Sequence, residues 1–279
     1  MLAFSVPFIK NFKYDSDVYE YTIEYDFDED TPTELMEFLN EYPNKKVVID
    51  IQTNIIDIKQ CAAMVKNFPN ITYRLDLLSA IAYHQELNEH KIPFMLYGIV
   101  ENLDMLHSFL QMGVSQITIG YELGFLLPRI FTMIKRDYPL IKIRVYPNFY
   151  QHIDYTGEMS FIKGFFIRPE DIRSYAQFVD IFELAVPENK KEGLKVLWEA
   201  YVKNQMWYGD LKPLINGLPQ SLDNRVIIPS FGPNRIKCGK RCYLDSGCNL
   251  CERILDLGET FIDKEVFLIP RKEENKNGS

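Results

Sequence analysis

Short apolar runs alternate with amphipathic segments along most of the chain, and this alternation is typical of an α/β fold. The runs of β type number eight, and they are VYEYTIEYDF from Val18, KKVVIDIQ from Lys45, ITYRLD from Ile71, PFMLYGIV from Pro93, QITIG from Gln116, IKIRVYPN from Ile141, KGFFIRP from Lys163 and FVDIFELAV from Phe178. Most of them start about 22–27 residues apart, which is the length of a strand–helix unit in a (β/α)8 TIM-like barrel.

Two architectures show this alternation, a closed barrel and an open doubly wound sheet. Both cover their strands on two faces, which accounts for nearly all-apolar strand cores such as VVIDI and ITIG. No Gly-rich phosphate-binding turn follows the first run, so the eight units favour the closed barrel. The leading run, LAFSVPFIK, is expected to plug the floor of the barrel or to pair at a sheet edge.

The periodicity ends after Tyr201, where the chain becomes rich in Pro, Gly, Asn and aromatic residues. We therefore predict a barrel over residues 1–205 and a C-terminal, cysteine-containing appendage over residues 206–270 that packs on the barrel. The charged segment over residues 271–279 is expected to be a disordered tail.

Composition limits the partners and the compartment. The 279 residues carry a net charge of −8, which argues against a protein that grips long stretches of phosphate backbone. No apolar run approaches the roughly 20 residues of a membrane span, and the N-terminus lacks the basic start and the cleavage site of a secretion signal. We therefore expect a cytoplasmic protein without a membrane partner, in a compartment where clustered thiols bind metals rather than form disulfides.

Four of the five cysteines fall within one short stretch, CGKRCYLDSGCNLC. Its spacing is C-x3-C-x5-C-x2-C, and the candidate ligands are Cys238, Cys242, Cys248 and Cys251. Four thiolates around one point suit either a [4Fe–4S] cluster or a tetrahedral Zn²⁺ ion. The C-x3-C half is less typical of zinc knuckles, so the spacing favours the cluster and leaves zinc open. Either centre would have a structural or a catalytic role.

In a barrel, the residues at the C-terminal ends of the strands face the active site. The polar residues at these positions are Asp50, Gln52, Arg74, Asp76, Tyr97, Glu101, Tyr121, Glu122, Arg144, Tyr146, Asn148, Arg168, Glu170 and Glu183. Among them, Arg74, Arg144, Arg168 and Glu183 are the candidate catalytic residues, because arginines pair with carboxylates or phosphates and an acid can serve as a general base. The alternative is that these side chains only balance one another as internal ion pairs.

The segment IKGFFIRPEDIRSYAQFVDIFELA resembles a stretch of the peptidase U32 (collagenase-like) family, in which an Arg-Pro-Glu-Asp element follows a late barrel strand. The segment ITIGYELGF is similar to a strand of that family that ends in a glycine. The resemblance implies a (β/α)8-like barrel and a four-cysteine [4Fe–4S] cluster, with hydroxylation of RNA bases or of quinone precursors as the activity. The family's cysteines spread over a longer span than those of this chain, and no nucleophile or zinc-protease motif supports proteolysis.

Together these features predict an iron–sulfur barrel enzyme that modifies a nucleic-acid base or a small aromatic substrate within a larger complex. In this hypothesis Arg74, Arg144, Arg168 and Glu183 orient the substrate. The rival hypothesis is a non-enzymatic scaffold with a zinc-stapled loop, whose basic residues at 235–241 contact a protein partner.

Overall fold

The computed structural model describes residues 2–9, 12–14, 18–25, 33–51, 56–124, 126–151, 164–186, 190–218, 221–227, 229 and 231–238. Its parallel strands are β1 (Phe4–Pro7), β2 (Glu20–Tyr25), β3 (Lys46–Ile51), β4 (Ile71–Leu75), β5 (Phe94–Leu96), β6 (Gln116–Thr118), β7 (Lys142–Val145) and β8 (Ile181–Glu183). They follow the order β5-β4-β3-β2-β1-β8-β7-β6. The two ends of this order meet where a parallel bridge joins Val100 to Ile119. The sheet is thus a nearly closed barrel, and the predicted (β/α)8 architecture is confirmed.

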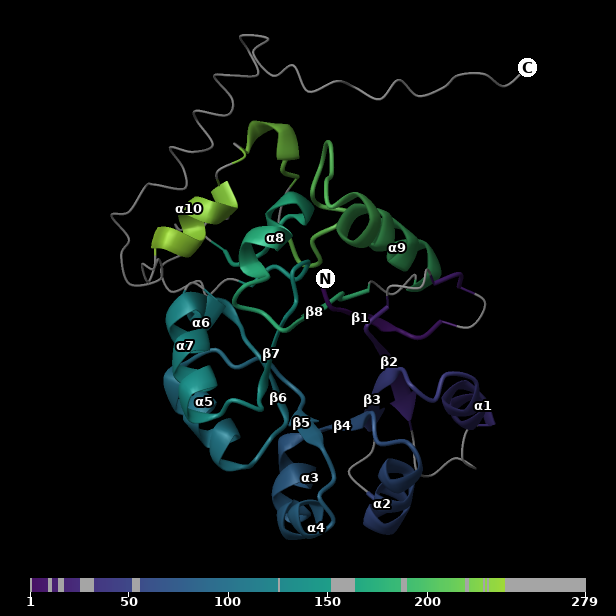
Figure 1. Cartoon of the computed structure of the whole chain (residues 1–279). Coiled ribbons are helices and arrows are strands. Elements are labelled where there is room, and N and C mark those ends of the chain that lie inside the picture. The colour runs from purple at the N-terminus through teal and green to yellow at the C-terminus, as the bar shows by residue number, and fades with distance from the viewer. Residues whose placement is uncertain are drawn as a thin grey trace, which may run out of the picture.

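The helices surround the strands on the outside of the barrel (Figure 1). They are α1 (Thr33–Glu41), α2 (Ile58–Asn67), α3 (Leu77–Ala82), α4 (His84–Glu89), α5 (Leu103–Gln111), α6 (Tyr121–Gly124), α7 (Leu127–Asp137), α8 (Ile172–Tyr175), α9 (Lys190–Leu197) and α10 (Phe231–Cys238), together with the π-helix η3 (Trp198–Asn204) and the 3-10 helices η2 (Pro169–Asp171) and η4 (Asn224–Val226). Asp57, Asp76 and Asn102 begin α2, α3 and α5, because each side chain accepts a hydrogen bond from an amide three residues later.

The identity of one strand differs from the prediction. The leading run forms β1, which lies between β8 and β2 inside the sheet, rather than a plug or an edge strand. The run that begins at Lys163 does not supply a strand in its described part, where Phe165 forms only an isolated antiparallel bridge with Gln151. Phe165, Phe166 and Ile167 are buried all the same. A short apolar run indicates that its residues are buried. It does not indicate whether they are buried in a strand or in a packed loop.

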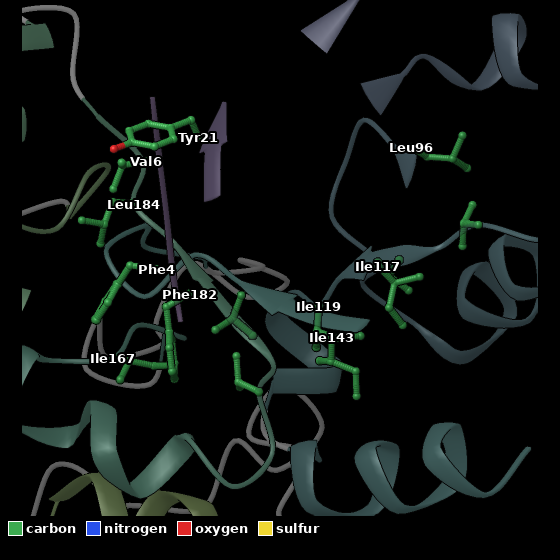
Figure 2. Close-up of a cluster of buried hydrophobic side chains, with 14 of the residues drawn as sticks. Phe4, Val6, Tyr21, Leu96, Ile117, Ile119, Ile143, Ile167, Phe182 and Leu184 are labelled. Atoms are coloured by element: carbon green, nitrogen blue, oxygen red, sulfur yellow. The ribbon is translucent and has the colours of Figure 1, made fainter. Parts of the chain in front are cut away.

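The two sides of the barrel wall differ in polarity. Outward-facing side chains are apolar and pack under the helices. Figure 2 shows several of them, including Phe4 of β1 and Phe182 of β8, whose ring centroids lie 5.9 Å apart. The inward-facing side chains include buried polar groups that bond to one another across the barrel, namely Glu20, Thr72, Arg74, Gln116, Arg144 and Glu183. The short apolar strands therefore enclose a polar interior, whose burial is offset by the hydrogen bonds and ion pairs that most of its groups make with one another.

The segment after η3 packs against the C-terminal end of the barrel. The Asn216 amide donates to the Asn148 carbonyl at 2.7 Å, and the Tyr150 amide donates to the Asn216 carbonyl at 2.8 Å. Arg235 of α10 donates to the Gly164 carbonyl at 2.5 Å. The predicted domain limits at residues 205 and 270 stay predictions. In the part of the chain that is described, no helix has both the length and the apolar character needed to cross a bilayer.

Candidate functional site

A cavity of about 520 Å³ opens at the C-terminal end of the barrel strands. Its walls combine charged, aromatic and aliphatic side chains, and the lining residues are Pro7, Phe8, Thr22, Ile23, Glu24, Leu35, Asp50, Arg74, Ile99, Tyr146, Phe149, Glu183, Leu184, Ala185, Val186 and Asn216. The strands β2, β3, β4 and β8 position most of the polar groups, and Asn216 comes from the segment after η3. Mixed walls of this kind suit a small organic ligand with one polar end.

A chain of buried ion pairs forms the base of this cavity. Arg74 donates through Nη2 to both carboxylate oxygens of Glu183, at 2.7 and 2.6 Å, and through Nη1 to Asp50 Oδ2 at 3.2 Å. Arg144 donates through Nη2 to Glu183 Oε2 at 2.6 Å, and through Nη1 to Glu20 and Gln116. Two guanidiniums thus share one carboxylate, and each has a further acidic partner.

Glu183 is fixed as an anion by this arrangement. Burial alone would raise the pKa of Glu183, but the guanidiniums of Arg74 and Arg144 outweigh burial and hold that pKa at about 2. A carboxylate with so low a pKa and with both oxygens engaged is a poor proton acceptor near neutral pH. Glu183 therefore orients the two arginines rather than moving a proton.

The pKa of Asp50 is shifted in the opposite direction from that of Glu183. Burial raises its pKa to about 7, because Arg74 offsets the desolvation only in part and Glu183 adds repulsion. Its Oδ1 atom is buried and has no hydrogen-bond partner in the described part of the chain. Asp50 lines the cavity and faces Arg74 in register across β3 and β4. A carboxyl group that exchanges its proton near neutral pH at a cavity wall has the properties of a general acid–base.

Aromatic rings stand beside the charged base. Tyr146 and Phe149 line the cavity with ring centroids 6.3 Å apart. The Arg74 guanidinium lies 5.9 Å from the Tyr97 ring centroid. Burial raises the pKa of Tyr146 well above its ordinary value, and the nearby Glu183 charge adds to this rise. Tyr146 therefore stays a neutral phenol, so the rings provide a flat, uncharged surface next to the ion pairs.

Arg168 lies apart from the other predicted catalytic residues. It donates through Nε and Nη2 to Asp171, at 2.6 and 3.0 Å, and through Nη1 to Asn224 and to the Ile227 carbonyl. Its guanidinium also packs 5.4 Å from the Phe231 ring centroid. Arg168 is not among the residues that line the cavity. The structure thus brings Arg74, Arg144 and Glu183 together and puts Arg168 in a contact between the barrel and the C-terminal segment.

The other predicted mouth residues divide in the same way. Asp50 and Tyr146 line the cavity, whereas Asp76 caps α3 and Asn148 bonds to the backbone of Ala185 and Leu214. Gln52 lies outside the described residues.

Sequence reasoning missed Glu20, Gln116 and Asn216. Glu20 and Gln116 begin β2 and β6, at the strand ends opposite the mouth, and they complete the partners of Arg144. The signal that was available for Glu20 and Gln116 is a polar residue in a run that otherwise reads as strand. No local signal marks Asn216, because the segment that carries it has no periodicity.

The predicted metal site falls mainly outside the described residues. Cys242, Cys248 and Cys251 belong to that part of the chain, and Cys238 ends α10 as a half-buried free thiol. The donor chemistry of four cysteines suits a thiolate-bound centre, and α10 fixes the first of them beside the barrel. Elsewhere in the described ranges, no group of three or more His, Cys, Asp or Glu side chains is arranged to hold a metal ion.

Comparison with known proteins gives one partial similarity. About a third of the chain, 34%, is 33% identical over 101 residues to a protein of Methanocaldococcus jannaschii described as an uncharacterized protease. The matched segment spans 29% of the length of that relative. No family model matches the chain. Over part of its length, the chain is therefore similar to a protein described as a protease. The barrel fold is known from the structure of this chain.

Proposed function

We propose that this protein is a U32-like barrel enzyme that modifies a small aromatic substrate or a nucleic-acid base in the cavity at the C-terminal end of the strands. The observation that carries the proposal is Asp50, a buried carboxyl group at the cavity wall whose pKa is about 7. In this role Asp50 transfers a proton to or from the substrate, and Arg74 orients the polar end of the substrate. Arg144 and Glu183 hold Arg74 in place.

The substrate class follows from the charges at the base of the cavity. With Asp50 protonated, the charges of Arg74 and Arg144 are balanced by Glu20 and Glu183, so the buried group is neutral. With Asp50 ionised, the same group carries one excess negative charge. An anionic aromatic ligand therefore binds best to the protonated form, with its ring against Tyr146 and Phe149 and its carboxylate or enolate oxygen beside Asp50.

Proteolysis is not part of the proposal, although the partial relative is described as a protease. The described residues that line the cavity include no serine, cysteine or histidine. A pair of carboxyl groups that share a proton is another route to peptide hydrolysis, but Glu183 is held as an anion by two arginines.

For the four cysteines we propose a single [4Fe–4S] centre, with zinc as the competing occupant. Bound near α10, such a cluster would supply electrons for the reaction or fix the C-terminal segment. Anaerobic purification followed by iron and zinc analysis separates these cases. Iron together with absorbance at about 400 nm supports the cluster. One zinc ion per chain in a colourless protein would contradict the cluster and favour a non-enzymatic scaffold that binds a protein partner.

The cavity proposal is tested by calorimetric titration with 4-hydroxybenzoate as an anionic probe and cytidine as a neutral one, at pH 5.5 and 8.5. We expect wild-type protein to bind 4-hydroxybenzoate about tenfold more weakly at pH 8.5, because ionised Asp50 repels it. Asp50→Asn should bind this probe equally at both pH values. Failure of both probes to bind, or an unchanged pH dependence in Asp50→Asn, would contradict the proposal.

A further inference from the structure

A second polar cluster lies at the opposite, N-terminal face of the barrel. Lys46 and Lys142 are the first residues of β3 and β7, and Tyr19 directly precedes β2. In the sheet order three strands, β2, β1 and β8, separate β3 from β7, so the two lysines reach Tyr19 from different sides of the floor. Lys142 Nζ lies 3.2 Å from the Tyr19 hydroxyl oxygen, and Lys46 Nζ donates to the same oxygen. Both ammonium groups also face the ring, at 4.0 Å for Lys46 and 5.6 Å for Lys142.

The positive charges of this cluster outnumber the negative charge beside it. No hydrogen bond joins Lys46 or Lys142 to a carboxylate in the described part of the chain. Glu20 pairs with Lys46 in register across β2 and β3 and attracts it, but the Glu20 carboxylate is shared with the buried guanidinium of Arg144. Tyr19 accepts in both of its hydrogen bonds, so its own hydroxyl hydrogen has no acceptor among the described residues. Two ammonium groups therefore share one neutral oxygen, an arrangement in which they repel each other.

The pKa of Tyr19 also indicates that this cluster favours a negative charge. Burial would raise the pKa of the Tyr19 phenol, but the two lysines outweigh burial and lower that pKa below its ordinary value. The cluster thus favours negative charge at the Tyr19 oxygen. An external anion supplies that charge without removing the phenolic proton. Tyr19, Lys46 and Lys142 are all half-buried, so the cluster is partly accessible to solutes.

We propose that Lys46, Lys142 and Tyr19 form an anion-binding site on the N-terminal face of the barrel, and that the site takes a phosphate group. Two ammonium groups and one hydroxyl provide donors from three separate elements, and a tetrahedral oxyanion presents an oxygen to each. A planar carboxylate has only two oxygens for three donors. The site lies at the other end of the strands from the cavity, so the proposal stands or falls independently of the proposed function.

Trace acetylation of the full-length wild-type protein, read by mass spectrometry, tests the site directly. Inorganic phosphate at about 10 mM is compared with chloride at the same ionic strength. For a dissociation constant of about 1 mM, phosphate should slow acetylation of both Lys46 and Lys142 about tenfold. Lys66, an exposed lysine on α2, is the internal control and should react equally in both salts. Equal slowing at Lys66, or protection of only one or neither of the two lysines, overturns the proposal.

Calorimetric titration of variants with inorganic phosphate assigns the donors. Lys142→Met should weaken binding about tenfold, and Tyr19→Phe, which removes one neutral donor, about threefold. Lys66→Met carries the same substitution at an exposed site and should bind as wild type does. Wild-type affinity in Lys142→Met would overturn the proposal. If Lys142→Met does not fold, the wild-type acetylation pattern decides the question alone.

Discussion

The protein contains two clusters of buried arginine. One lies at the candidate site, and the other forms a structural contact around Arg168 that we call the clamp. In the barrel interior, Arg74 and Arg144 pair with Glu183, and Asp50 completes the group at the wall of a cavity. Between the barrel and the C-terminal segment, Arg168 pairs with Asp171 and ties the segment around Asn224 to the turn before α8. All three arginines are at most 4% exposed, so burial and ion pairing do not separate the two clusters.

Unsatisfied atoms alone do not separate them either. Asp50 Oδ1 and Glu170 Oε2 are both buried without a hydrogen-bond partner in the described structure, and burial raises the pKa of both carboxyl groups. The difference is access, because Asp50 borders the cavity and Glu170 does not line it. A perturbed carboxyl group next to space for a ligand indicates a site, whereas the same group inside a packed contact indicates a clamp.

The largest expected effect in this comparison is that of Arg144→Met. The change leaves Glu20 without its guanidinium and removes one of the two that hold Glu183, so the free energy of unfolding should fall by about 3–5 kcal/mol. Urea denaturation measures the loss. The pKa of Asp50, followed by carbon NMR of its carboxyl group, should also rise, since Arg144 helps to lower it. An unchanged Asp50 pKa would mean that the interior pairs do not act as one network.

Arg168→Met is the matched substitution in the clamp. It should lower the free energy of unfolding by about 3 kcal/mol, because Asp171 loses its buried partner and Phe231 loses a packing surface. The Asp50 pKa and the affinity for 4-hydroxybenzoate should stay at wild-type values. Loss of probe binding with unchanged stability would instead return Arg168 to the site.

Asp50→Asn removes a pH dependence rather than a fixed amount of stability. The folded-state pKa of Asp50 is raised to about 7, above that of an ordinary aspartate. Its contribution is therefore fully present below the unfolded pKa and is lost as the pH rises through the folded value. Between pH 4 and pH 7, wild-type stability should decline relative to Asp50→Asn by up to about 1.4 kcal/mol per pH unit. Parallel pH profiles in urea denaturation would show that Asp50 titrates normally.

The smallest change in the free energy of unfolding is expected for an exposed ion pair. This pair is a reference against which the effects in the two buried clusters are compared. Lys203 and Glu199 lie one turn apart on η3, with their charged atoms 2.9 Å apart and side chains 43% and 45% exposed. Water and salt screen such a pair, so Lys203→Ala should change the free energy of unfolding by about 0.3 kcal/mol. A loss as large as that of Arg168→Met would remove the distinction between buried and exposed pairs in this protein.

Part of the candidate site follows from sequence periodicity. Arg74, Arg144 and Glu183 each lie at a strand end where a barrel turns its side chains toward the mouth, and the structure brings these three together. Asp50 was on the same list, as the single acid in the strand core VVIDI, but nothing local distinguished it from its neighbours. Its raised pKa depends on burial and on Glu183, which is far away along the chain.

The sequence by itself determined the alternation of strands and helices, their spacing and therefore the barrel, because periodicity and caps act over a few residues. It also determined that four thiols lie close together along the chain. Tertiary structure decided that the leading run is a strand, that Arg74 meets Glu183 across 109 positions, and that Arg168 faces a different segment. The physical reason is that alternation fixes which side of the wall a residue faces, whereas its partner depends on how the whole sheet closes.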